Sequence, residues 1–130
     1  MSSLTTRQLS PTPDTIAPDG SEVRLLAAVP RGSMAHFTLP PGAVTRAVAH
    51  HTVEEVWFFV GGRGRMWRRL GGEEITVDVF PGVSIAIPTG AAFQFRADGD
   101  AALEIVGVTM PPWPGDGEAY PVEGIWPATI

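Results

Sequence analysis

Glycine and proline interrupt this sequence so often that we expect no long helix. Of its 130 residues, 15 are Gly and 13 are Pro, and both types are spread along the whole chain. Between them lie short runs rich in β-branched and aromatic residues, which favour strands. Many short strands with no helical pattern between them are typical of a β-sandwich or a closed barrel. We therefore predict an all-β fold.

The strand-like runs can be delimited one by one. We expect strands within residues 21–29, 33–39, 45–50, 54–60, 64–69, 73–80, 83–88, 92–97 and 102–110. Tight-turn sequences rich in glycine, which tolerates positive φ, lie at 61–64, 70–74 and 97–100. Each of these turns is predicted to join two neighbouring strands in a hairpin.

The chain divides into three segments by composition. Residues 1–19 are rich in Ser, Thr and Pro and are expected to form a flexible N-terminal arm. Residues 20–110 hold all the strand-like runs and form a single barrel domain. Residues 111–130 form a Pro- and Trp-rich tail, whose aromatic rings should pack on the barrel or on a partner subunit. An apolar tail of this kind favours a homodimer.

Composition excludes several classes of function. The chain has no cysteine, which excludes a disulfide scaffold and a thiolate zinc site. Its net charge of −5 offers no positive field for phosphate backbones, so no nucleic acid partner is expected. The longest uncharged stretch is broken by Pro and Gly, and the first residues lack a secretory signal. We therefore expect a cytoplasmic protein without a membrane span.

Two stretches of the sequence resemble the motifs of a known family. HHTVEEVWFFVGG occupies residues 50–62, and PGVSIAIPTG occupies residues 81–90. Both are similar to the paired motifs of the cupin superfamily, and the resemblance covers residues from about 21 to 110. It implies a double-stranded β-helix, or jelly-roll, barrel in a single domain.

The resemblance also implies where metal ligands would fall. In the family, the first motif carries a His-x-His pair and a glutamate, and the second motif carries a further histidine. Counted from Glu55 and Gly90, these positions are Ala49, His51, Glu55 and Phe93. Half of the usual ligands are therefore absent, and two protein ligands seldom hold a divalent ion.

The strand register around these residues stays open, because neighbouring side chains in a strand point to opposite faces. One register presents His51 with Glu55, and a slip by one residue presents His50 with Glu54. Either pair is a candidate for acid/base catalysis, since histidine changes protonation near neutral pH and burial shifts the pKa of a carboxyl group.

Aromatic residues recur at alternate positions on the predicted strands, so they share one face of each strand. We predict that the pocket is lined by His36, Trp57, Phe59, Phe93, Gln94 and Phe95. With Phe93 in place of a histidine, the cavity suits an apolar or aromatic small molecule. The leading hypothesis is therefore a small cupin that binds such a ligand, with metal-independent acid/base chemistry of the isomerase, cyclase or lyase type.

Two alternatives come from other classes of function. In the first, His51 and Glu55, with His50 or Gln94, hold Fe, Mn, Ni or Zn in a metal-dependent dioxygenase, isomerase or polyketide-cyclase-like enzyme. In the second, the barrel is a non-catalytic sensor or storage protein that acts through oligomerisation.

Overall fold

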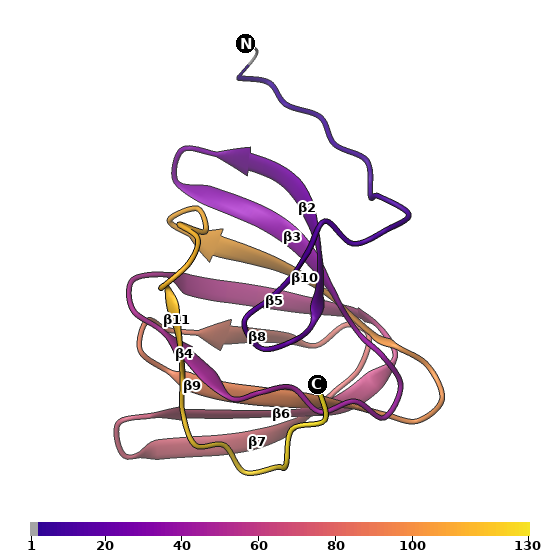
Figure 1. Cartoon of the computed structure of the whole chain (residues 1–130), viewed down its shortest axis with the longest axis vertical. Coiled ribbons are helices and arrows are strands. Elements are labelled where there is room, and N and C mark those ends of the chain that lie inside the picture. Colours follow the sequence, from indigo (N-terminus) through magenta and orange to yellow (C-terminus); the bar gives the residue numbers. More distant parts are fainter. Residues whose placement is uncertain (1–2) are drawn as a thin grey trace.

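The computed structural model, which describes residues 3–130, consists of two antiparallel sheets packed face to face (Figure 1). The six-stranded sheet has the order β1 (Thr15–Ile16), β2 (Glu22–Val29), β3 (Gly32–Leu39), β10 (Leu103–Met110), β5 (Glu54–Gly61) and β8 (Ser84–Ile87). The five-stranded sheet has the order β11 (Ala119–Pro121), β4 (Val48–His50), β9 (Ala92–Asp98), β6 (Arg63–Leu70) and β7 (Glu73–Val79). The predicted all-β jelly-roll barrel is confirmed.

Each of the predicted strand-like runs overlaps one strand, with ends that differ by a few residues, and together these strands are β2 to β10. Two further strands, β1 and β11, were not expected from the sequence, and they are only two and three residues long. Both pair at the edge of a sheet, β1 with β2 and β11 with β4. Segments this short carry no alternating pattern of apolar residues, so nothing in the sequence marks them as strands.

The predicted hairpins are wrong at two of the three turns. The turn at 70–74 does join the paired strands β6 and β7. The turns at 61–64 and 97–100 instead carry the chain from one sheet to the other, because β5 and β6, like β9 and β10, belong to different sheets. At the first corner Gly62 has a φ of 72° and lies so close to the backbone of Ala102 that a Cβ would overlap it. Glycine marks a sharp change of direction there, but does not tell a hairpin from a sheet crossing.

The core lies between the two sheets and follows the alternation of side chains along each strand. In β5 the buried residues are Glu55, Trp57 and Phe59, while Val56 and Phe58 between them are exposed. The facing strand β9 contributes Phe93 and Phe95 to the same core. Buried aromatic side chains of this size supply much of the apolar area that stabilises the barrel.

The C-terminal tail packs against its own barrel, on the outer face of the five-stranded sheet. Its apolar residues join a second buried group, here called the tail cluster, which comprises Ala47, Trp67, Ala92, Val122 and Trp126. Gln94 ties this cluster together, because its amide donates to the carbonyls of Thr45 and Trp126 and accepts from the backbone of Ile125 and Trp126. Every hydrogen-bonding direction of that side chain is thus used within the chain.

The arm also contacts the barrel. Arg24 on β2 donates hydrogen bonds to the carbonyls of Ser10 and Pro11, and Thr15–Ile16 forms β1. The predicted boundaries at residues 20 and 110, and the flexibility of the arm, stay predictions. Within residues 3–130, no helix has the length and apolarity needed to cross a bilayer.

Candidate functional site

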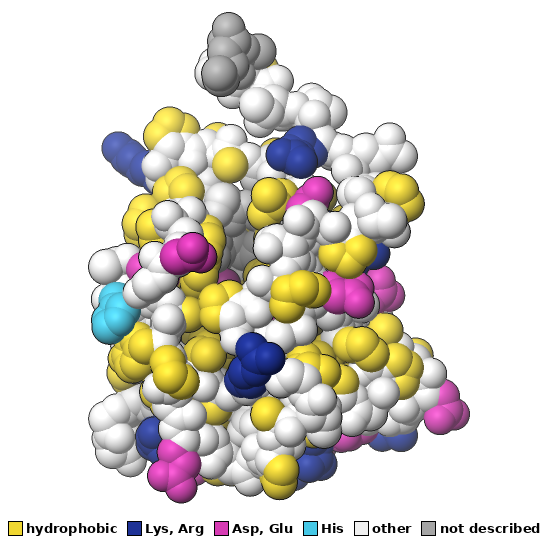
Figure 2. All heavy atoms as spheres, in the orientation of Figure 1, with side chains coloured by type: hydrophobic (Ala, Val, Ile, Leu, Met, Phe, Trp, Pro, Cys, Tyr) yellow, Lys and Arg dark blue, Asp and Glu magenta, His cyan; other side chains and the backbone are white. Residues whose placement is uncertain are grey.

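One end of the barrel is hollow. A cavity of about 460 Å³ opens between the sheets beside the β2–β3 hairpin, and the surface is visibly hollowed there (Figure 2). Its apolar lining includes Val23, Phe37, Val48, Trp57, Phe93 and Trp113. Residues 15–19 of the arm and 115–117 of the tail complete the rim. A cavity of this volume, mostly apolar and with few polar groups, has the character of a small-molecule site.

The aromatic wall of the cavity requires a glycine, which has no side chain, on the neighbouring strand. Gly107 lies on β10 opposite Trp57, and a Cβ there would come within 2.7 Å of the Phe37 ring and 2.8 Å of the Trp57 ring. Without that Cβ the two rings approach to 5.4 Å between centroids. The Trp57 ring also meets the edge of Phe93 at 5.6 Å. These contacts give the cavity a rigid, flat-sided wall.

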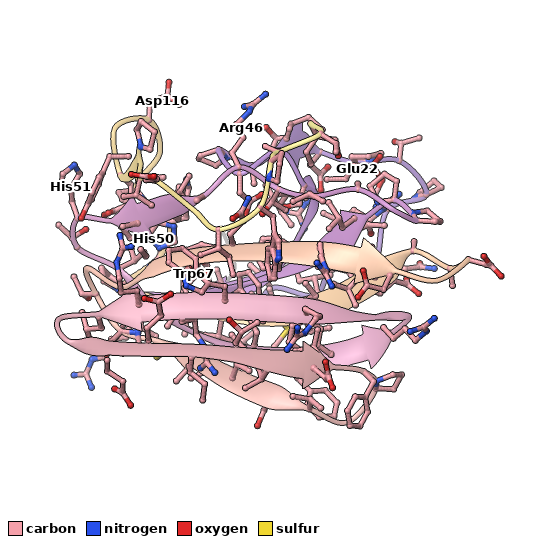
Figure 3. All side chains as sticks on the ribbon, turned by 90° about the horizontal axis from the view of Figure 1, so that it is seen from below. Glu22, Arg46, His50, His51, Trp67 and Asp116 are labelled. Carbon is pink, nitrogen blue, oxygen red and sulfur yellow. The ribbon has the colours of Figure 1, made fainter. Side chains whose placement is uncertain are left out.

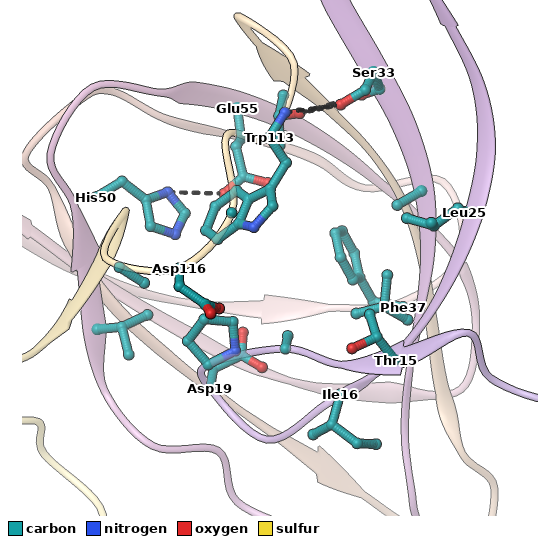
Figure 4. A pocket seen from close by; sticks show the side chains of 18 of the residues that line it. Thr15, Ile16, Asp19, Leu25, Ser33, Phe37, His50, Glu55, Trp113 and Asp116 are labelled. Carbon is teal, nitrogen blue, oxygen red and sulfur yellow. Dashed lines mark hydrogen bonds and ion pairs between the residues drawn. The ribbon is translucent and has the colours of Figure 1, made fainter.

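A buried histidine and a buried carboxylate meet in the cavity wall (Figure 4). His50 Nδ1 lies 3.1 Å from Glu55 Oε2, and the two side chains are only 5% and 3% exposed. The atoms are close enough for an ion pair but are not aligned as a hydrogen bond. The other carboxylate oxygen of Glu55 accepts a hydrogen bond from the Trp57 indole at 3.1 Å. The His50 ring packs edge-on against Phe93 and Trp113.

The turn between β4 and β5 determines which residues form this pair. Glu118 accepts hydrogen bonds from the backbone and the hydroxyl of Thr52, and its carbonyl accepts from the backbone of His51. From the second motif, Thr89 donates to the carbonyl of Thr52, and the backbone of Gly90 donates to the carbonyl of His50. The tail and the second motif therefore hold this turn of the first motif from both sides, next to His50.

Neither of the two predicted registers occurs as a whole. The structure takes His50 from one and Glu55 from the other, while His51 and Glu54 are exposed. Figure 3 shows the His51 side chain at the outer edge of the molecule. His51 stacks on the ring of Tyr120 at 4.3 Å, away from the cavity. The physical reason is that β4 ends at His50 and β5 begins at Glu54, so the intervening turn breaks the alternation that both registers assume.

The other predicted pocket residues divide into those that reach the cavity and those that do not. Trp57 and Phe93 line it, whereas the buried rings of Phe59 and Phe95 belong to the core and are not among the lining residues. Gln94 follows Phe93 on the same strand, so it points to the opposite face and into the tail cluster.

His36 also lies outside the cavity. It precedes Phe37 on β3 and therefore points to the outer face of the sheet, where its Nε2 lies 3.5 Å from a carboxylate oxygen of Glu104. Burial lowers the pKa of His36, with Arg24 acting in the same direction and Glu104 opposing it. The neutral imidazole is therefore favoured. Because its side chain faces the outside of the sheet, His36 does not line the cavity.

A second buried carboxylate in the cavity was not expected from the sequence. Asp19 is 6% exposed and lines the cavity, where its Oδ1 accepts hydrogen bonds from the backbone and the hydroxyl of Ser21. Burial raises the pKa of Asp19 and the Glu55 charge adds to this, while the Ser21 hydrogen bonds and His50 oppose it. The sequence around it, APDGSE, reads as an ordinary turn, and only the folding of the arm brings it to the cavity.

The tail supplies lining residues that were also missed. Trp113 and Asp116 reach the rim from the segment after β10, and the backbone of Trp113 donates a hydrogen bond to the Ser33 hydroxyl (Figure 4). The exposed fraction of Trp113 is 36%, which is high for so large a ring. The only signal in the sequence was that a tail with this aromatic content needs a surface to pack on.

The donor set does not fit a resident metal ion held by three or four protein ligands. Within residues 3–130, no group of three or more His, Cys, Asp or Glu side chains is arranged to hold one. His50 and Glu55 are two donors, and the position where a further histidine is expected holds the apolar ring of Phe93 against His50. The residue of β4 that faces the cavity beside His50 is Val48, which has no donor atom, so the usual coordination is incomplete.

Comparison with known proteins gives the family and the fold. A family model described as a cupin domain matches residues 35–109. Among solved structures, CapF from Staphylococcus aureus superposes with a TM-score of 0.70 at 20% identity, over 85% of this chain and 31% of CapF. Oxalate decarboxylase from Bacillus subtilis gives 0.70 at 17% identity, over 84% of this chain and 29% of that one. The chain thus spans about a third of these two proteins, and no curated protein matches it.

Proposed function

This chain belongs to the cupin domain family, and on that premise we propose that it binds a small, largely apolar or aromatic organic molecule in the cavity at the end of its barrel. The observation that carries the proposal is a cavity of about 460 Å³ whose aromatic wall contains one buried histidine–carboxylate pair. Aromatic rings would hold the body of the ligand, and the pair would orient its polar group. In support, one CapF structure was determined with an inhibitor, 3-isopropenyl-tropolone.

The reaction that this arrangement suits is proton transfer within one bound molecule. Glu55 or His50 would take a proton from an activated carbon or hydroxyl, leaving the electron pair of that bond on the ligand. The group that accepted the proton would then return it to a second atom of the same molecule, which leaves both side chains in their starting protonation states, as an isomerase requires. The low exposure of both side chains limits their contact with bulk water.

A neutral fluorescent probe tests the binding site. N-phenyl-1-naphthylamine brightens when it leaves water for an apolar cavity, so its titration reports occupancy. Ala35 lines the cavity, and Ala35→Trp should fill it and weaken probe binding by about tenfold or more. Ala86→Trp places the same side chain on the exposed face of β8 as a control, and should bind like the original protein. Absence of probe binding, or equal binding by Ala35→Trp, would contradict the proposal.

A metal-dependent enzyme is the alternative, and elemental mass spectrometry separates the two. We expect less than one divalent ion per chain in untagged protein, and unchanged probe binding after chelator dialysis. One tightly held ion per chain would favour the metal-dependent reading instead, with waters completing the coordination by His50 and Glu55.

The remaining alternative is a non-catalytic sensor or storage barrel that acts through oligomerisation, so a measurement of oligomeric state tests it. The homodimer stays a prediction, which a solution mass tests. The tail packs on its own barrel through Gln94 and Trp126, so the tail itself no longer argues for a second subunit.

A further inference from the structure

The charged groups of the cavity are unevenly distributed. Asp19, Glu55 and Asp116 all lie in its lining, and Figure 4 shows their side chains around the same space. The lining contains no Arg or Lys, and His50 is its single basic residue. Three carboxylates against one imidazole give the cavity a negative potential, which its apolar walls concentrate.

Asp19 has binding capacity that the fold leaves unused. Both hydrogen bonds from Ser21 end on Oδ1, and none of the described residues donates to Oδ2. The side chain is nevertheless more than nine-tenths buried and lies in the cavity wall. A buried carboxylate without a cation beside it is costly, and burial accordingly raises the pKa of Asp19. A positive group in the cavity would remove that cost.

The aromatic lining suits the same kind of group. The rings of Phe37, Trp57, Phe93 and Trp113 border the cavity. The face of an aromatic ring attracts a cation, most strongly for tryptophan, and recognition of ammonium groups in proteins commonly combines such rings with a carboxylate. An anionic ligand would meet repulsion from the three carboxylates, and the lining offers it no arginine and only the His50 imidazole as a partner.

We propose that the ligand of this cavity is an organic cation, a protonated amine or quaternary ammonium on an apolar or aromatic body, with its charge held by Asp19, Glu55 and Asp116. This inference rests on the proposed function and names the class of its ligand. Asp19 and Asp116 are then specificity-determining residues contributed by the arm and the tail, outside residues 35–109 that match the family model.

Displacement of N-phenyl-1-naphthylamine by charged and neutral competitors tests the inference. Benzyltrimethylammonium carries a permanent charge, benzyl alcohol is neutral and benzoate is an anion, and all three share one aromatic ring. We expect benzyltrimethylammonium to displace the probe at a concentration about tenfold lower than either of the others. Asp19→Asn and Asp116→Asn should each reduce that preference about threefold or more. Asp116 lies on an exposed turn, so its variant does not endanger folding.

The control is Asp78→Asn, an exposed acid on β7 that pairs with Arg65 and lies outside the cavity lining. It should retain the full preference for the cation. Equal displacement by the three competitors, or a preference that survives in both cavity variants, would overturn the inference while leaving the proposed function in place. If the probe itself fails to bind, the proposed function and the inference both fail.

Discussion

Two regions of this barrel bury polar side chains among aromatic ones, and they do so in opposite ways. Beside the tail cluster, the side-chain amide of Gln94 makes all its hydrogen bonds with backbone groups of the chain itself. In the cavity, His50 Nδ1 has no aligned partner and Asp19 uses one of its two oxygens. A saturated buried group stabilises the fold, whereas an unsaturated one beside a cavity is available to a ligand.

Strand β9 lies between the two regions, and two consecutive residues of this strand face one region each. Phe93 faces the cavity and Gln94 faces the tail cluster, because successive side chains of a strand point to opposite faces. Each region also holds two of the four tryptophans, Trp57 and Trp113 in one and Trp67 and Trp126 in the other. The regions can therefore be disturbed and observed separately.

The largest expected effect is on the tail cluster. Gln94→Leu leaves the backbone groups of Thr45, Ile125 and Trp126 without partners, and should lower the free energy of unfolding by about 3 kcal/mol. Denaturant unfolding measures it, with the exposed Gln8→Leu as the control. Probe binding in the cavity should be unchanged in the folded fraction. A Gln94→Leu variant that keeps its stability but loses probe binding would reverse the roles assigned to the two regions.

The second effect is on the turn that carries His50. Glu118→Ala removes the acceptors of the Thr52 backbone and hydroxyl, and should cost about 2 kcal/mol and weaken probe binding as well. Burial would raise the pKa of Glu118, but the hydrogen bonds from Thr52 and His51 outweigh burial and lower that pKa. The exposed Glu123→Ala on the tail serves as the control. Stability loss with full probe binding would show that the turn does not position the site.

The fold and the candidate site were within reach of the sequence to different degrees. Strands β2 to β10 follow from alternation and turn residues, which act locally. The pairing of His50 with Glu55 was not predicted, because it depends on where β4 stops, and the following turn is held by residues distant in the sequence, Glu118 in the tail and Thr89 in the second motif. Asp19 was missed for the same reason, since only the tertiary path of the arm brings it to the cavity.

The third prediction has the opposite sign. Asp19→Asn should stabilise the native state at neutral pH by about 1 kcal/mol, because it removes a buried charge but keeps an acceptor for Ser21. Burial raises the folded pKa of Asp19 above its ordinary value of 3.8. The protonated side chain therefore favours the native state below about pH 3.8, and this part of the free energy of unfolding is lost as pH rises through the folded pKa. Urea unfolding at about pH 4 and about pH 7 measures this. A variant with no advantage at the higher pH would contradict the burial of that charge.

The smallest effect belongs to His51. Its ring is exposed and contacts Tyr120 outside the cavity, so His51→Ala should change stability by less than about 0.5 kcal/mol and leave probe affinity unchanged. His50→Ala is the matched comparison, since it removes the neighbouring histidine from the cavity wall and should weaken probe binding. Equal losses of probe affinity in the two variants would place both histidines in the site.

The separation of the two regions is tested most directly by the indole N–H signals in a proton–nitrogen correlation spectrum during titration with benzyltrimethylammonium. We expect the signals of Trp57 and Trp113 to shift with a common dissociation constant, because both rings line the cavity. The signals of Trp67 and Trp126 should stay in place, because these rings pack in the tail cluster. Shifts confined to Trp67 and Trp126, or no shift in any of the four, would contradict the assignment of the cavity as the binding site.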